Sequence, residues 1–113
     1  MPVCHLEHVN EDITWGIWNI QEQEDELLQA YKILAQDQEL KIIKPPLRRK
    51  QWIAGRMLLK EILTSHDVPF RGVIKDSYKK AWLDGYDSYI SIAHSDNLAI
   101  AILNKQHSTG IDI

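Results

Sequence analysis

The sequence predicts an α+β domain in which a small, mostly antiparallel sheet packs against one long helix. Three observations predict this fold. Apolar residues alternate with period two over residues 13–20, helical periodicity begins after Pro45 and Pro46, and short apolar stretches separated by turn residues fill the C-terminal part. At 113 residues without an internal repeat, the chain is expected to form a single domain, residues 1–113, with its own core.

The stretch "ITWGIWNI", residues 13–20, predicts the first strand. Ile13, Trp15 and Ile17 point to one face of an extended chain, and Trp18 and Ile20 point to the other. Because both sets are large and apolar, we expect both faces of this strand to be covered.

Two helices are expected next. In "QEQEDELLQAYKIL", acids precede the apolar positions, which suits the positive end of a helix dipole. Pro45 and Pro46 then interrupt the chain, and proline is tolerated at the first helical position but not inside a helix. We therefore place a long second helix at Pro46–Ser65.

A helical wheel at about 100° per residue sorts the long helix into an apolar arc and a basic edge. The arc holds Trp52, Gly55, Leu58, Leu59, Ile62 and Leu63, and the edge holds Arg49, Arg56 and Lys60. Two interpretations stay open. The basic side chains either lay their alkyl stems along the core face and keep their charges in water, or they form a site for an anion. Glycine is unfavourable within a helix, so Gly55 indicates close packing against another element.

The remainder of the chain is expected to be mostly β-structure. Strands are predicted near Val73 and at residues 81–83, 89–93 and 97–103, with the turn His94-Ser95-Asp96-Asn97 joining the last two. His94 would lie where strand meets turn, either as a structural hydrogen-bonding group or as a ligand contact. Asp112 in "TGIDI" lies between apolar residues, which suits an outward-facing acid of an edge strand or a metal ligand on a rigid element.

Composition narrows the class of protein. The 13 Lys plus Arg residues are outnumbered by 16 Asp plus Glu residues, so no overall basic charge favours nucleic acid. The longest aliphatic run, residues 98–103, is too short to cross a membrane. One cysteine, Cys4, cannot form an internal disulfide, and no signal peptide pattern opens the chain. We expect a cytoplasmic protein that binds neither nucleic acid nor membranes.

Four stretches in order carry a resemblance to a known family: "RRKQWIAGRMLLKEIL", "SYKKAWL", "SIAHSDNLAIAIL" and "GIDI". Together they resemble the N-terminal half of the two-half, surfactin-synthetase-activating class of 4'-phosphopantetheinyl transferases, from residue 13 to the end of the chain. The resemblance implies a transferase-like half domain. It also implies transfer of the 4'-phosphopantetheine arm of coenzyme A to a serine of an acyl or peptidyl carrier protein, which yields the holo carrier protein.

The resemblance also implies the residues that bind coenzyme A. Arg56 and His94 match the family's contacts to the nucleotide phosphates, and Ser95 and Arg49 are expected beside them. Lys80 matches the lysine of a Gly-Lys-Pro segment, although the chain reads Lys-Lys-Ala there, without the glycine and the proline. The family's Ser-His-Ser hairpin reads Ala-His-Ser in this chain, so a contact through the first serine hydroxyl is absent.

Asp112 matches the first acid of the family motif Gly-x-Asp-x-Glu, which implies a catalytic aspartate that binds Mg²⁺. A hard cation with oxygen ligands would neutralise pyrophosphate charge during attack by the carrier serine. The sequence stops at Ile113, and the following glutamate and a Trp-x-x-Lys-Glu segment do not occur in it.

We therefore expect this chain to supply one half of an active site and to be incomplete and inactive alone, with the C-terminal half absent. Its partner would be a complementary C-terminal half or a second copy in a homodimer. The alternative is a non-catalytic coenzyme A-binding or assembly module of the same ancestry.

Overall fold

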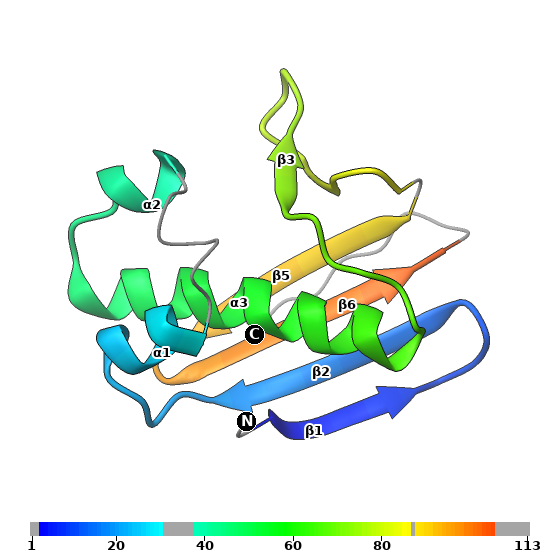
Figure 1. The fold of residues 1–113 in the computed structure, drawn as a ribbon, viewed down its shortest axis with the longest axis horizontal. Coiled ribbons are helices and arrows are strands. Elements are labelled where there is room, and N and C mark those ends of the chain that lie inside the picture. The colour runs from blue at the N-terminus through cyan, green and yellow to red at the C-terminus, as the bar shows by residue number, and fades with distance from the viewer. Residues whose placement is uncertain (1–2, 31–37, 87, 106–113) are drawn as a thin grey trace.

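The computed structural model describes residues 3–30, 38–86 and 88–105. Within them the chain forms one sheet in the order β1-β2-β6-β5-β4-β3, and every neighbouring pair is antiparallel (Figure 1). The elements are β1 (Val3–His8), β2 (Ile13–Asn19), α1 (Glu24–Ala30), α2 (Gln38–Ile42), α3 (Pro46–Ser65), β3 (Val73–Lys75), β4 (Ala81–Leu83), β5 (Tyr89–Ser95) and β6 (Leu98–Asn104).

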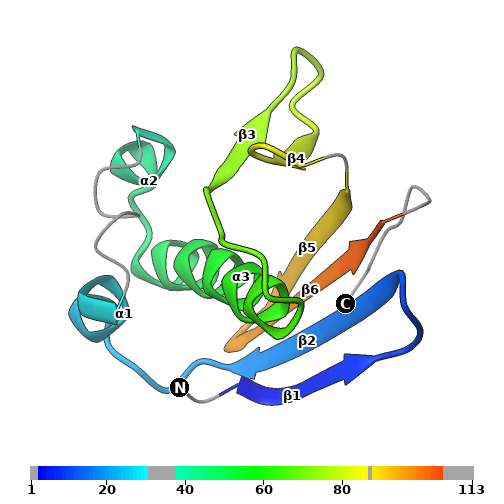
Figure 2. The same cartoon turned by 45° about the vertical axis from the view of Figure 1, so that its right-hand side comes forward.

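The architecture has two layers. Helix α3 crosses one face of the sheet and packs on β6, β2 and β5, while α1 packs against α3 (Figures 1 and 2). The short strands β3 and β4 rise from the β5 edge as a hairpin that stands beside α3 (Figure 2). The predicted α+β class, with an antiparallel sheet and one long helix, is confirmed. None of the described helices combines the length and the apolar character needed to cross a bilayer.

Helix α3 has the predicted bounds, and proline explains its start. Pro45 takes the N-cap position in an extended conformation, with φ −62° and ψ 129°, as expected for a residue before another proline. Pro46 opens the helix where its missing N–H would have no intrahelical partner. At the other end, the backbone N–H of His66 donates to the carbonyl of Leu63.

The core lies between α3 and the sheet, where Trp18, Ile53, Leu58, Leu59 and Ile62 are fully buried. Along β2, alternate residues Thr14, Gly16 and Trp18 are buried beneath the helix. The opposite face of β2 is only half-buried, so the expectation that both faces would be covered is wrong. The three described helices lie on one side of the sheet, which leaves the other side of β2 without a described helix above it (Figures 1 and 2).

The hairpin of β5 and β6 is longer than predicted. His94 pairs with Ala99 and Ser95 pairs with Leu98, so the turn contains only Asp96 and Asn97, and the prediction of a turn beginning at His94 is wrong. Asp96 has φ 48°, a left-handed conformation that aspartate tolerates better than most residues. His94 therefore sits on a rigid strand rather than in a loop.

Two described elements were not expected from the sequence. Strand β1 pairs with β2 at the edge of the sheet, although "VCHLEH" alternates only weakly. Helix α2 has only five residues, too few for a clear periodic pattern. Helix α1 has the predicted acidic first turn at Glu24, Asp25 and Glu26 and is described to Ala30, so the rest of the predicted helix, residues 31–34, lies outside the described residues.

Candidate functional site

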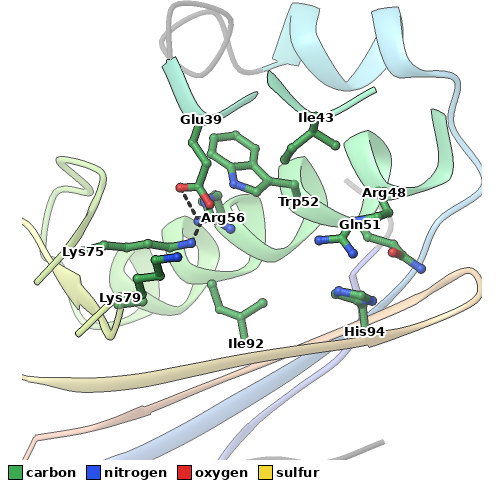
Figure 3. Close-up of a pocket in the computed structure, with 11 residues that line it drawn as sticks. Glu39, Ile43, Arg48, Gln51, Trp52, Arg56, Lys75, Lys79, Ile92 and His94 are labelled. Carbon is green, nitrogen blue, oxygen red and sulfur yellow. Dashed lines mark hydrogen bonds and ion pairs between the residues drawn. The ribbon is translucent and has the colours of Figure 1, made fainter. Parts of the chain in front are cut away.

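A cavity of about 280 Å³ opens between α2, α3, the β3–β4 hairpin and β5. Four apolar side chains, Ile43, Trp52, Ala81 and Ile92, belong to its lining, and its polar lining contains one acid among several basic side chains: Glu39, Arg48, Arg56, Lys75, Lys79 and His94 (Figure 3). Gln51 completes the wall. A concave site with apolar side chains and convergent cations suits an organic anion, because the cations hold the charge and the apolar side chains exclude water.

Arg56 contributes the most deeply buried charge of this cavity. It lies one helical turn after Trp52, its guanidinium carbon is 4.0 Å from the centroid of that indole ring, and only 6% of the residue is exposed. Stacking on an aromatic face leaves the N–H groups of the guanidinium edge available to oxygen acceptors. One of these nitrogens, Nη2, lies 3.6 Å from Oε2 of Glu39.

Glu39 on α2 faces two cations from different elements. Lys75 Nζ on β3 donates to Oε1 of Glu39 over 2.6 Å, while Arg56 approaches the second carboxylate oxygen (Figure 3). Burial by itself would raise the pKa of Glu39. The hydrogen bond from Lys75 and the charges of Arg56 and Lys75 outweigh burial, so the pKa of Glu39 is lowered and the group is a carboxylate at neutral pH.

Trp52 leaves a buried donor in this wall. Its indole Nε1 is on the side of the ring that faces the Glu39 carboxylate and helps to lower the pKa of that acid (Figure 3). Among the described residues, however, this N–H has no hydrogen-bond partner of ordinary geometry. Buried donors are normally paired, so the cavity holds a donor that a suitable ligand oxygen could satisfy.

His94 reaches the same cavity from the sheet. Residues 90, 92 and 94 of β5 share the face toward α3, and His94 is the one of them nearest the turn to β6. Gln51 fixes this end by donating from Nε2 to the carbonyl oxygen of Asp96 over 2.7 Å, which ties α3 to the hairpin turn. Arg56 and His94, separated by 38 positions in the sequence, thus line one cavity.

Three other expected coenzyme A contacts do not line this cavity. Arg49 donates to Glu24 over 2.8 Å and to the carbonyls of Leu40 and Ile43 over 2.6 and 2.8 Å, and so it joins α1 and α2 to α3. Ser95 follows His94 and therefore points to the opposite face of the sheet.

Lys80 turns away from the cavity as well. Its ammonium nitrogen lies 4.7 Å from the ring centroid of Trp82 and 5.4 Å from that of Tyr89. The preceding residue, Lys79, lines the cavity and has φ 65°. Arg48 likewise lines the cavity where Arg49 was expected. In both dibasic pairs the sequence indicated a basic site, and the neighbour of the expected residue faces it.

Asp112, the expected catalytic and magnesium-binding residue, lies outside the described residues. Within the described part of the chain, no group of three or more His, Cys, Asp or Glu side chains could hold a metal ion.

No protein-family model matches this chain, and no curated protein matches its sequence. The chemistry of the cavity and of the residues that line it therefore provides the basis for a proposed function.

Proposed function

We propose that the cavity binds the phosphates of coenzyme A, and that the chain acts as the N-terminal half of a 4'-phosphopantetheinyl transferase. The observation that carries this proposal is the convergence of Arg56 on α3 and His94 on β5 in one cavity with further cations. The family resemblance of the sequence implies the same two residues as phosphate contacts. An α+β fold with an antiparallel sheet against one long helix is compatible with the half domain of that family.

The proposed reaction assigns a limited role to the residues of this chain. The carrier serine oxygen forms a bond to the β-phosphorus of coenzyme A, the bridging bond to the α-phosphate breaks, and 3',5'-ADP leaves. Arg56, His94, Arg48 and Lys79 would hold and orient the phosphates through charge-assisted hydrogen bonds, and Ile92 and Trp52 would shield them from water. The base that accepts the serine proton would come from a complementary half or from a second copy.

Magnesium is part of this proposal only through Asp112. The ion would neutralise charge on the pyrophosphate as the bond to the leaving group breaks. Its site stays a prediction, because Asp112 lies outside the described residues. The carrier protein, the cytoplasmic location and the complementary half are proposals of the same kind.

Calorimetric titration of coenzyme A tests the binding step without a carrier protein. We expect Arg56→Ala and His94→Ala each to weaken binding by about tenfold or more, because a hydrogen bond to a charged group contributes roughly 1.5–3 kcal/mol. Lys60→Ala is the matched control, since Lys60 lies exposed on the same helix and does not line the cavity. Thermal unfolding, together with the charge-conserving Arg56→Lys, separates lost contacts from lost folding.

Unchanged affinity in both the Arg56 and the His94 variants would reject the cavity as the coenzyme site. Binding that depends on both residues, but without transfer to a carrier protein when a complementary half is added, would instead favour a non-catalytic coenzyme A-binding module.

A further inference from the structure

Glu39 lies in the part of the cavity where three hydrogen-bond donors of other residues converge. Its carboxylate receives the ammonium of Lys75 at 2.6 Å and faces the guanidinium of Arg56 at 3.6 Å, and the indole N–H of Trp52 is directed toward it (Figure 3). The three donors come from β3 and α3, whereas Glu39 comes from the short helix α2. No other acid lines the cavity in the described part of the chain.

This set of donors suits a phosphate better than a carboxylate. An ammonium, a guanidinium and an indole N–H can serve three oxygen atoms at once, and phosphate offers three or more in a tetrahedral arrangement. Glu39 offers two oxygens in a plane, and the Trp52 N–H has no hydrogen-bond partner of ordinary geometry among the described residues. The carboxylate therefore offsets only part of the positive charge of the cavity and leaves a buried donor that a larger oxyanion could satisfy.

We propose that Glu39 is an internal competitor that determines which anions enter this cavity. Its tethered carboxylate excludes singly charged anions, and a phosphate that carries two or more charges displaces it from Arg56 and Lys75. This inference rests on the proposed phosphate-binding function, and it adds a specificity-determining residue to that site.

The competition has a physical basis in tethering and exposure. A carboxylate fixed on α2 is present at high effective concentration, so a free monoanion of similar binding strength cannot replace it. A multiply charged phosphate gains more Coulomb energy from the same cations and can do so. The Glu39 side chain is 33% exposed, so it can rotate toward water after release from Arg56 and Lys75, at a modest cost.

A second role for Glu39, as a group that positions the cations, predicts the opposite effect of its removal on anion binding. If Glu39 served to hold Lys75 and Arg56 in place for the ligand, its removal would disorder the cations and weaken binding. Glu39→Gln separates the two roles, because glutamine has nearly the same shape as glutamate and lacks its charge.

The experiment titrates two inorganic or simple probes, pyrophosphate and dimethyl phosphate, into the full chain at constant pH and ionic strength. Dimethyl phosphate carries one charge and pyrophosphate carries several. We expect Glu39→Gln to bind pyrophosphate roughly tenfold more tightly than wild type, the scale for removing one like charge a few ångströms from the ligand at a partly screened site. Dimethyl phosphate should bind measurably only to the variant.

Two controls make the result specific. Glu61→Gln makes the same chemical change on α3 outside the cavity and should leave both affinities unchanged. Arg56→Ala reports on the proposed function itself. If Arg56→Ala loses pyrophosphate binding while Glu39→Gln binds equally or more weakly than wild type, the competitor role is refuted and the phosphate site stands. If neither wild type nor Glu39→Gln binds pyrophosphate or coenzyme A, both proposals fail.

Discussion

Gly55 sets the distance between α3 and β5, and its replacement by alanine tests how the cavity is built. A methyl group at this position would lie 2.6 Å from Cγ2 of Ile92 on β5. Ordinary contacts between carbon atoms are about 3.5–4.0 Å, so the overlap is about 1 Å. Cγ2 is bonded directly to the branched Cβ of Ile92, so relief requires a rotamer change or a movement of the helix.

Two opposing terms decide the stability of Gly55→Ala. Alanine in mid-helix is favoured over glycine by about 1 kcal/mol. Overpacking costs roughly 1–3 kcal/mol, and the middle of that range applies because Ile92 is half-buried and borders the cavity. We therefore expect a net destabilisation of about 1 kcal/mol. The variant should also bind pyrophosphate more weakly, because moving α3 outward carries the adjacent Arg56 away from His94.

Urea denaturation followed by tryptophan fluorescence measures the stability term, and a double-mutant cycle with Ile92→Ala isolates its cause. In the Ile92→Ala background the obstacle is gone, so Gly55→Ala should stabilise the protein by about 1 kcal/mol through helix propensity alone. A Gly55→Ala protein that is more stable than wild type, with Ile92 in place, would refute the close packing of α3 on β5.

Two further predictions address charge. Arg49→Ala should lower the free energy of unfolding by about 1–3 kcal/mol, because the carboxylate of Glu24 and the carbonyl oxygens of Leu40 and Ile43 lose a charged donor. Arg48→Ala should instead weaken pyrophosphate binding with little effect on the urea midpoint. If Arg48→Ala instead lowered the free energy of unfolding and Arg49→Ala weakened pyrophosphate binding, the two arginines would have the opposite roles. Burial and the charges of Lys105 and His8 lower the pKa of His66 from its ordinary value near 6.5. The unfolded chain then binds more protons, so stability should fall as the pH drops below about 6.5. His66→Gln, which can still form a hydrogen bond with Thr14, should flatten this dependence in urea titrations.

The long helix and the last hairpin could be predicted from the sequence because their signals are local. Pro45 and Pro46 specify the start of α3 through backbone sterics, and apolar runs on either side of Asp96 and Asn97 specify a tight antiparallel pair. Strand β1 could not be predicted in this way, because its place at the sheet edge depends on pairing with β2. Helix α2 is too short for periodicity, and with it Glu39 was missed.

The sequence pattern indicated a basic site on α3 but did not identify which of its basic side chains line the cavity. On a helical wheel Arg49 lies within about 20° of Arg56, which made both candidates for one anion site. The wheel gives an angle but not the neighbours at each height, and seven residues separate these two side chains by about 10 Å along the axis. At the height of Arg49, α1 supplies the carboxylate of Glu24, and Leu40 of α2 and the following Ile43 supply two carbonyl oxygens that accept its hydrogen bonds.

The side chains of Lys79 and Lys80 point in different directions because of the backbone conformation of the turn. Asp76 accepts hydrogen bonds from the N–H groups of Tyr78 and Lys80, and Lys79 between them takes φ 65°, so simple alternation of side chains fails across this turn. Lys79 therefore faces the cavity, while Lys80 lies near the ring of Trp82. In both pairs the residue that the sequence indicates contacts other parts of the fold, and its neighbour lines the cavity. A dibasic pair beside a predicted site is thus better tested with both residues than with one.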